Sequence, residues 1–221
     1  MDRLTRVHGR RSALFTKLDI HWGYNNICMC NGDQWKAAFK TNCGLFEPMV
    51  MFFGLTNAPA TFQSMMNHLF RELINEGYVT IYMDDILIHT PNNPALHQRV
   101  VNDVLRILAV NNLYLKPQKC QFEQTEVKYL GVIIWEDSIA MDLIKVQGVK
   151  NWKRPSTLKE VRAFLGFLNF YCMYIPGFSM LATPLNVLVS RCAKGGKFYW
   201  NDEHEATFNA LVDAVCMAPV L

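Results

Sequence analysis

Two apolar runs of strand length carry aspartates in their interior, where a folded chain rarely leaves a carboxylate without compensation. Asp19 lies in the run 15–20, and the adjacent pair Asp84 and Asp85 lies in the run 79–88. The second run predicts a buried hairpin that turns at the aspartate pair. Removing a carboxylate from water costs several kcal/mol, and adjacent like charges add to that cost. We expect no lysine or arginine within the runs to offset these charges, so a divalent cation is the compensation that suits oxygen-only ligands.

Three carboxylates at strand ends around Mg²⁺ are typical of a site for phosphoryl transfer. The alternative is that Asp84 and Asp85 form a surface turn, which is the commoner role of an Asp-Asp pair taken alone. The apolar residues on both sides of the pair, together with the second aspartate within a strand, favour the metal site.

The composition bounds the class of protein. The chain has 221 residues, 51% of them hydrophobic, which suffices for one large or two small domains. No apolar stretch reaches the roughly 18 residues of a membrane span, and the basic start of the chain lacks the apolar region of a signal peptide. The seven cysteines are scattered without zinc-ligand spacing, so we expect reduced, mostly buried thiols in an intracellular protein.

Charge is segregated along the chain. Residues 142–200 contain nine lysines and arginines against two acids, a net charge of +7, whereas the whole chain carries only +3. This excess of positive charge indicates a polyanion partner for the C-terminal part. A solvated basic face is the alternative.

The first 140 residues alternate strand and helix patterns. Strands are expected over 13–20 and 34–40, and a strand or hairpin over 128–135. Asn57 and Pro59 mark the start of a helix that follows apolar spacing to residue 75 and ends at Gly77; a second helix is expected over 95–110. This order predicts an α+β fold, an antiparallel sheet with helices on one face.

After residue 138 the pattern becomes helical. Thr157 to Glu160 form a capping box, and the helix that follows has an apolar face. Its opposite face presents Arg162, Gly166 and Phe170, an unusual set for a solvent face. Glycine would allow another backbone to approach closely, and the aromatic ring could stack or lie in a groove. A second packing surface against a neighbouring helix is the alternative.

Several segments together resemble the reverse transcriptases of Gypsy-type LTR retrotransposons, which are transposable elements. The matching segments are Phe15 to Tyr24, Phe52 to Gln63, Tyr82-Met83-Asp84-Asp85, Tyr129-Leu130-Gly131, Phe164 to Tyr171 and Tyr174 to Phe178. They follow the order and spacing of the family over essentially the whole chain.

The resemblance implies a polymerase palm followed by a helical thumb. The palm, with a remnant of the fingers, would span residues 1–140, and the thumb residues 141–195. Residues 196–221 would begin a connection or RNase H-like region. The fingers would be largely missing, because only 18 residues precede Asp19.

The resemblance also assigns roles at the active site. Asp19, Asp84 and Asp85 would be catalytic and would ligate two Mg²⁺ ions, with Mn²⁺ as a possible substitute. Lys119 matches a lysine proposed to protonate pyrophosphate. Tyr24 matches the aromatic that excludes a 2′-hydroxyl.

Further positions would contact the substrates. Phe53 and Gly54 would bind the nucleotide; Phe53 stands where retroviral enzymes have glutamine, although phenylalanine is usual in the Gypsy group. Nucleic acid would be held by two sets of residues, a primer grip and a helix face along the minor groove. They are Tyr129, Leu130 and Gly131 for the grip, and Arg162, Gly166 and Phe170 for the helix face.

The implied activity is RNA-directed DNA polymerisation, in which dNTPs are added to a primer on an RNA or DNA template. One alternative is a truncated, catalytically impaired nucleic-acid-binding remnant, and we expect the chain as given to polymerise poorly without the fingers. Another is a different palm-type enzyme. Tyr24 argues against an RNA polymerase, which must admit the 2′-hydroxyl, and the thumb helix argues against a nucleotide cyclase, which needs no duplex grip. No membrane partner is expected.

Overall fold

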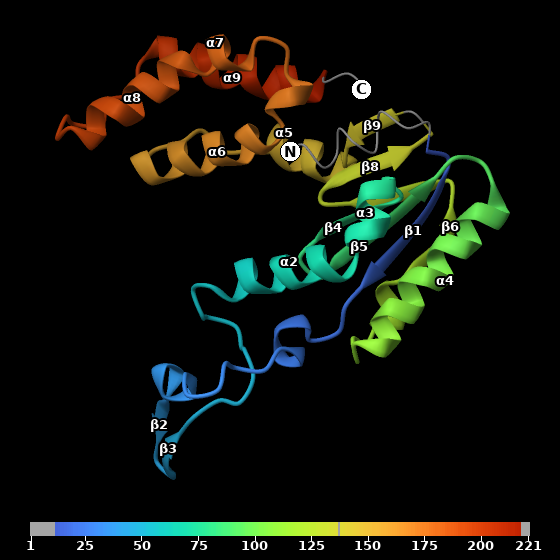
Figure 1. The fold of residues 1–221 in the computed structure, drawn as a ribbon. Coiled ribbons are helices and arrows are strands. Elements are labelled where there is room, and N and C mark those ends of the chain that lie inside the picture. The colour runs from blue at the N-terminus through green and yellow to red at the C-terminus, as the bar shows by residue number, and fades with distance from the viewer. Residues whose placement is uncertain (1–11, 137, 218–221) are drawn as a thin grey trace. The chain divides into compact units, whose positions relative to one another are not determined.

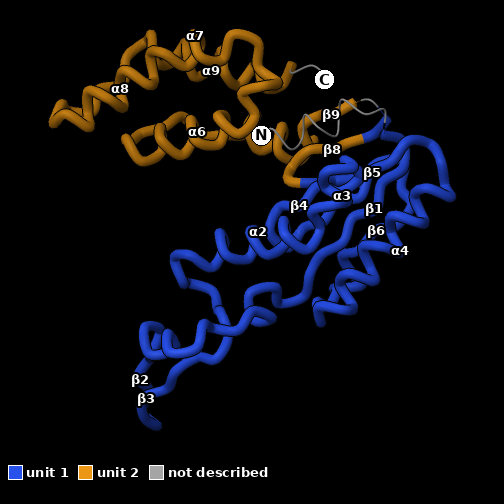
Figure 2. Tube along the Cα trace, in the orientation of Figure 1, with its two compact units in different colours: residues 1–129, 135–137 blue, residues 130–134, 138–221 orange. Residues whose placement is uncertain are grey.

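The computed structural model describes residues 12–136 and 138–217, and the basic start of the chain lies outside them. The chain forms two compact units, residues 1–129 with 135–137 and residues 130–134 with 138–221 (Figure 2). The division at residue 130 describes compactness alone, so the palm and thumb boundaries stay predictions.

Unit 1 is built on a four-stranded antiparallel sheet of order β4-β5-β1-β6 (Figure 1). Its strands are β1 Leu14–Asp19, β4 Val79–Tyr82, β5 Asp85–Thr90 and β6 Gln121–Gln124. Three helices contact this sheet: α2 Ala58–Leu69, α3 Arg71–Glu76 and α4 Pro94–Val110. The expected α+β class is confirmed.

All three helices cover the same face of the sheet. Alternate strand residues such as Leu18 and Ile86 share one core with helix residues such as Phe62 and Val104, and all four are fully buried. Side chains alternate between the two faces of a strand, so the residues between these apolar positions face the other side. Asp19 and Asp85 occupy such intervening positions.

Local signals account for the start of α4 and the end of α3, whereas Asn57 precedes α2 without a capping hydrogen bond from its side chain. The Asn93 side chain accepts a hydrogen bond from the Leu96 amide at 3.1 Å and starts α4, and Gly77, at φ 78°, ends α3. The single helix expected to residue 75 is broken at Phe70, which leaves helical geometry and buries its ring completely in the core.

The strand expected over 34–40 is largely wrong. Residues Gln34–Ala37 form a 3-10 turn (η2). The Lys36 amide donates to the Asp33 backbone oxygen at 3.1 Å, and Lys36 Nζ lies 2.6 Å from the Asp33 carboxylate, which stabilises the turn. Strand geometry begins only at β2, Phe39–Thr41, which pairs with β3, Gly44–Phe46. Two further 3-10 turns in unit 1 are η1 Gly23–Asn26 and η3 Pro117–Lys119.

The division between the units falls at a strand–turn–strand segment. β7, Glu126–Tyr129, ends the first part of unit 1, and β8, Val132–Trp135, and β9, Ser138–Met141, follow in a sheet of order β7-β8-β9. The expected strand or hairpin over 128–135 is therefore a hairpin that turns at Leu130-Gly131.

The helical character expected after residue 138 begins only at Leu143, because Ser138–Met141 forms strand β9. The helical elements of unit 2 are α5 Leu143–Lys150, α6 Leu158–Phe170, η4 Cys172–Tyr174, α7 Phe178–Leu181, α8 Thr183–Ala193 and α9 Asp202–Cys216. Phe164 links these helices in the core, with ring centroids 5.5 Å from Trp152 and 4.8 Å from Phe208.

The α6 capping box forms in a modified way. The Thr157 hydroxyl accepts from the Glu160 amide at 3.3 Å, as expected, and the Glu160 carboxylate also accepts from the Ser156 amide at 2.7 Å and the Ser156 hydroxyl at 2.9 Å. Together these hydrogen bonds satisfy amides at the start of α6.

The expectation of buried thiols is wrong. All seven cysteines are free, and each is exposed or half-buried. Among residues 12–136 and 138–217, no helix combines the length and apolar character needed to cross a membrane.

Candidate active site

The pairing of β1 with β5 brings carboxylates distant in sequence together. In this antiparallel register Asp19 lies directly opposite Asp85, and the Ile20 amide donates to the Asp84 backbone oxygen at 2.9 Å. Directly opposed residues have Cβ atoms about 4.5–5.5 Å apart, so two like charges here repel. All three predicted carboxylates therefore gather at one end of the sheet.

The hairpin that carries the pair turns one residue earlier than expected. Tyr82 pairs with Asp85, so the two-residue loop is Met83-Asp84, and Met83 has φ 54°. A side chain bearing Cβ is strained in this left-handed region. The shift places Asp84 in the loop and Asp85 at the start of β5.

Asp84 is the carboxylate with the fewest compensating contacts. Its Oδ1 atom is buried and accepts no hydrogen bond among the described residues. Burial, followed by the charges of Asp19 and Asp85, raises the pKa of Asp84 above its ordinary value, and Lys119 partly opposes this.

Gly23 makes room for this carboxylate. A Cβ on Gly23 would collide with Asp84 Oδ1 and lie 2.8 Å from the ring of Phe62. Only glycine fits between these groups.

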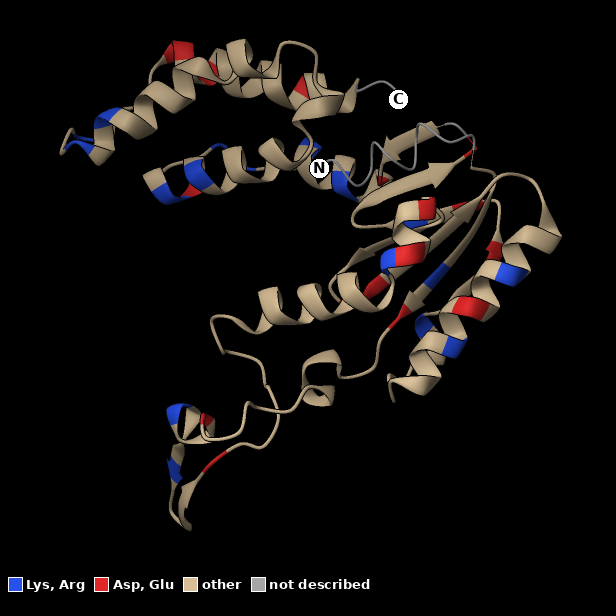
Figure 3. Cartoon of the chain, viewed as in Figure 1, with Lys and Arg blue, Asp and Glu red and all other residues tan. Residues whose placement is uncertain are grey.

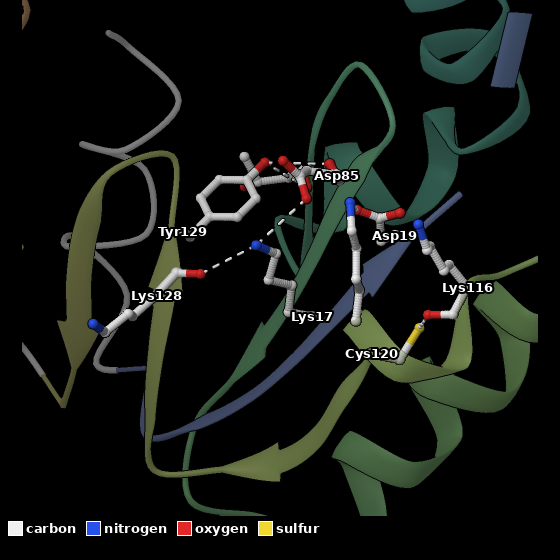
Figure 4. Close-up of polar contacts among 9 residues, drawn as sticks. Lys17, Asp19, Asp85, Lys116, Cys120, Lys128 and Tyr129 are labelled. Carbon is white, nitrogen blue, oxygen red and sulfur yellow. Dashed lines mark hydrogen bonds and ion pairs between the residues drawn. The ribbon is translucent and has the colours of Figure 1, made fainter. Parts of the chain in front are cut away.

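The other two aspartates each contact a lysine. Lys17 Nζ lies 3.5 Å from Asp85 and donates to the Lys128 backbone oxygen at 3.3 Å (Figure 4). Lys119 Nζ lies 3.1 Å from Asp19. The expectation that no basic residue within the runs offsets the carboxylates is therefore wrong, since Lys17 belongs to the first run. It reaches Asp85 because alternation places Lys17 and Asp19 on the same face of β1.

The donor set suits a hard divalent cation, because carboxylate oxygens are the ligands that Mg²⁺ and Mn²⁺ prefer. Within the described part of the chain, however, no three Asp, Glu, His or Cys side chains stand close enough to hold a metal. Lys17 pairs with Asp85 and Lys119 with Asp19. The buried Oδ1 of Asp84, which accepts no hydrogen bond among the described residues, is the oxygen that a cation would contact.

Tyr24 borders the same site. Its side chain is buried, and its ring makes edge contacts with Phe53 (4.9 Å) and Phe62 (5.7 Å). Burial, followed by the charges of Asp84 and Tyr82, raises the pKa of Tyr24 above its ordinary value. Phe53 itself is exposed, and Gly54, at φ 110°, adopts a conformation that favours glycine.

Tyr129, Leu130 and Gly131 serve different structural roles. The side chain of Tyr129 is fully buried in unit 1, with its hydroxyl 3.4 Å from the Asp85 backbone oxygen, so only its backbone can face a ligand. Leu130 and Gly131 form the turn that follows, with φ 50° and 83°. In unit 2 the Tyr171 hydroxyl donates to the Gly131 oxygen at 3.2 Å.

Arg162, Gly166 and Phe170 form one exposed face of α6 in unit 2, as expected from helical spacing. A Cβ on Gly166 would meet no atom within 4 Å among the described residues. Phe170 is 46% exposed, with its ring against Tyr171.

The basic residues of unit 2 are not equivalent. Lysine and arginine mark α5, α6 and the end of α8, whereas acidic residues gather on α9 (Figure 3). Arg154 lies 3.1 Å from Glu205 and over the Trp200 ring, so α9 already neutralises one of the nine basic residues.

The chain matches the family model for reverse transcriptase (RNA-dependent DNA polymerase) over residues 3–134. The chain belongs to the reverse transcriptase family. It is also 36% identical to the transposon Tf2-3 and Tf2-7 polyproteins of Schizosaccharomyces pombe (strain 972 / ATCC 24843) over 218 residues. These alignments cover 99% of the chain but 16% of each polyprotein, so the chain spans about a sixth of the length of these relatives. The resemblance to Gypsy-type elements is confirmed.

Solved reverse transcriptases share the fold. A foamy viral protease–reverse transcriptase in complex with double-stranded DNA superposes with a TM-score of 0.84 at 25% identity, covering 98% of this chain and 38% of that one. A foamy viral protease–reverse transcriptase in complex with an RNA/DNA hybrid gives 0.81 at 24% identity, covering 96% and 29%.

Three residues at the site of this reverse transcriptase chain were not identified from the sequence. They are Gly23, Lys17 and Gln63, of which Gln63 bonds to the aspartate hairpin. A lysine two residues before a strand-borne aspartate was an available signal for Lys17. Gly23 and Gln63 lie within segments that match the family, but the sequence did not assign either a role, because the hairpin that they contact is remote: Gln63 and Met83 are 20 residues apart.

Proposed function

We propose that this chain is the catalytic core of an RNA-directed DNA polymerase of a Gypsy-type retrotransposon, which extends a primer with dNTPs on a nucleic-acid template. The observation that carries the proposal is the register of β1 against β5. It joins Asp19, Asp84 and Asp85 at one end of a sheet in a chain that belongs to the reverse transcriptase family.

The three carboxylates would hold divalent cations, Mg²⁺ or Mn²⁺, once Lys17 and Lys119 release Asp85 and Asp19. Cations bound there would activate the primer 3′-hydroxyl and stabilise the charge of the leaving pyrophosphate. Asp84 is the strongest candidate ligand, because its buried oxygen has no hydrogen-bond partner among the described residues. Asp85 would bind more weakly, since Lys17 competes for its carboxylate.

Lys119 and Tyr24 would act on the nucleotide. Lys119 contacts Asp19, so its ammonium stands beside the carboxylates, where it could give a proton to the pyrophosphate oxygen that leaves. The ring of Tyr24, fixed between Phe53 and Phe62, would stand under the sugar and exclude a 2′-hydroxyl. Phe53 and Gly54 would border the same nucleotide.

The template–primer would be held by contacts that do not depend on base sequence. The Leu130-Gly131 turn would contact the primer end, and the exposed α6 face would follow the minor groove with Arg162 near phosphates. Solved relatives in complex with double-stranded DNA and with an RNA/DNA hybrid support such partners for this chain.

Primer extension on poly(rA)–oligo(dT) tests the proposal. The chain is assayed with Mg²⁺ or Mn²⁺, alone and joined to the segment that precedes the matching region in a related element. Asp84→Asn is the matched control, because it keeps the shape of the side chain and removes its charge. Synthesis that requires both the metal and Asp84 supports the proposal. Absence of synthesis by both forms of the folded protein contradicts it.

A further inference from the structure

The hairpin loop that carries Asp84 adopts a conformation that its own residues do not favour. Its loop, Met83-Asp84, contains no glycine, and Met83 adopts φ 54°, where a Cβ is unfavourable. Among the strands that the structure describes, β4 is also the edge strand of its sheet, next to β5 on one side only. A loop of this kind keeps one conformation only where the surroundings hold it.

Gln63 of α2 provides such contacts. Its Oε1 accepts from the Met83 amide at 2.9 Å, and its Nε2 lies 3.4 Å from the Ile81 backbone oxygen, to which it donates. The two contacts lie on either side of Tyr82. The side-chain amide therefore pairs with the outer edge of the hairpin much as the peptide group of another strand would.

The chemistry of the partners fixes the orientation of the Gln63 amide. A backbone N–H can only donate, so the oxygen of Gln63 must face Met83 and the nitrogen must face Ile81. The second N–H of this nitrogen donates to Asn67 Oδ1 at 2.9 Å, which holds the amide from its other side. Gln63 is half-buried, so water competes weakly for these bonds.

We infer that Gln63 is a positioning residue of the candidate active site, which fixes the left-handed Met83 and thereby aims the carboxylate of Asp84. The inference rests on the proposed function for its catalytic consequence. Gln63 lies outside the cation-binding set, because its amide is committed to the hairpin and to Asn67. Its effect on metal binding passes through the loop that it holds.

Two variants of Gln63 and one control separate the contacts. Gln63→Met keeps the length of the side chain and removes all three hydrogen bonds. Gln63→Glu keeps an acceptor for the Met83 amide and removes the donor to Ile81. Asn67→Ala removes the third partner of the amide and leaves both bonds to the hairpin.

The rate of hydrogen exchange at the Met83 amide in the metal-free protein measures how well Gln63 protects this amide, independently of activity. We expect exchange to quicken about fivefold or more in Gln63→Met and to stay near the parent rate in Gln63→Glu and Asn67→Ala. Unchanged exchange in folded Gln63→Met would overturn the inference. If Gln63→Met does not fold, fast exchange in Gln63→Glu, which keeps the acceptor, overturns it.

Titration calorimetry on the same proteins measures Mn²⁺ affinity, which depends on how the Asp84 carboxylate is positioned. Loss of a supporting contact around a metal ligand typically weakens affinity by about 10–100-fold, and we expect the lower part of this range in Gln63→Met. Asn67→Ala should bind as the parent does. Gln63→Met could show faster Met83 exchange but bind Mn²⁺ as tightly as the parent, while Asp84→Asn abolishes binding. That result would show that Gln63 holds the loop but does not position Asp84 as a ligand.

Failure of the proposed function has a different signature. If the parent binds no Mn²⁺, the proposed metal site fails and the positioning role fails with it, whereas Met83 exchange still reports whether Gln63 holds the loop. If the parent binds Mn²⁺ but does not extend primers, affinity alone decides the positioning role.

Discussion

At the scale of single residues, the charge of Asp84 opposes folding in the absence of metal. Its carboxylate is half-buried beside Asp19 and Asp85, and one oxygen accepts no hydrogen bond among the described residues. Such a group is retained for what it binds and not for what it adds to stability. Removing its charge should therefore make the metal-free protein more stable.

We expect Asp84→Asn to raise the melting temperature in EDTA, by about 2–4 °C for each kcal/mol of repulsion removed. The folded state binds the Asp84 proton more tightly than the unfolded state, because its pKa is raised above the ordinary 3.8. Parent stability therefore falls as pH rises from that value through the raised pKa. The difference between variant and parent should be widest near pH 7 and narrow toward about pH 4.

Scanning calorimetry across this pH range checks the expectation, and Mn²⁺ supplies the control. Mn²⁺ should raise the melting temperature of the parent, since binding to the native state alone stabilises it, and should leave Asp84→Asn nearly unchanged. A variant less stable than the parent in EDTA at every pH would contradict this account.

Substitution of Tyr24 tests whether this buried aromatic residue also discriminates deoxyribonucleotides from ribonucleotides. Tyr24→Ala should raise ribonucleotide relative to deoxyribonucleotide incorporation by about tenfold or more, a loss of about 1.4 kcal/mol of discrimination. The substitution also opens a cavity against Phe62 and should cost about 3–5 kcal/mol of stability, so the assay belongs well below the melting temperature.

Tyr24→Phe is the matched control, because it keeps the ring and should keep the incorporation ratio. The measurement is single-nucleotide primer extension with paired dNTP and NTP series. If Tyr24→Ala destabilises the protein but leaves the ratio unchanged, Tyr24 is only a core aromatic.

At the scale of secondary structure elements, local patterns predicted β1, α4 and the helices of unit 2, although these begin at Leu143 and not at residue 138. They did not predict the contacts that assemble the site. Alternation and capping are encoded by neighbouring residues, so they are visible in the sequence. The left-handed Met83 is not, because a remote residue, Gln63, holds it. The break at Phe70 likewise depends on a core that the local pattern does not specify.

The pairing of lysines with aspartates has the same origin. Lys119 and Asp19 are 100 residues apart, and only the fold brings them within 3.1 Å. Motif resemblance identified the three aspartates as candidate ligands. It assigned no role to Gly23, whose missing side chain leaves space for Asp84.

The exposed face of α6 offers a test that separates duplex binding from folding. Gly166→Val should weaken binding of an RNA–DNA duplex, because the side chain blocks close approach of the backbone to the groove. It should leave the melting temperature unchanged or slightly higher, since an added Cβ meets no described atom and glycine is the poorer helix former. Fluorescence anisotropy and thermal melting measure the two effects.

Gly166→Ala is the graded control, with a smaller expected loss of affinity. Unchanged affinity in both folded variants would favour the alternative that this face packs against another protein surface. If both variants lose affinity and folded structure together, Gly166 is needed for folding, and the prediction of direct contact between this face and a duplex is wrong.

At the scale of the whole molecule, charge is divided between the parts of the chain. Residues 142–200 carry +7 although the chain as a whole carries +3, and the acids of α9 belong to the same unit as all nine of these basic residues. Only those basic side chains that no acid already neutralises are expected to displace counterions from a duplex. Among them Arg162 is exposed on α6, whereas Arg154 contacts Glu205 and Trp200.

This difference predicts unequal effects of two arginines on salt dependence. Each phosphate contact contributes about −0.9 to the slope of log affinity against log salt concentration for duplex DNA. Arg162→Gln should therefore make the slope less negative by about one contact. Arg154→Gln should leave it nearly unchanged and cost at most about 1 kcal/mol of stability, as expected for an exposed ion pair. Anisotropy titrations across a series of KCl concentrations give all three slopes. Equal changes in both variants would show that Arg154 leaves Glu205 for the duplex, and a parent slope near zero would remove electrostatic duplex binding from the proposed function.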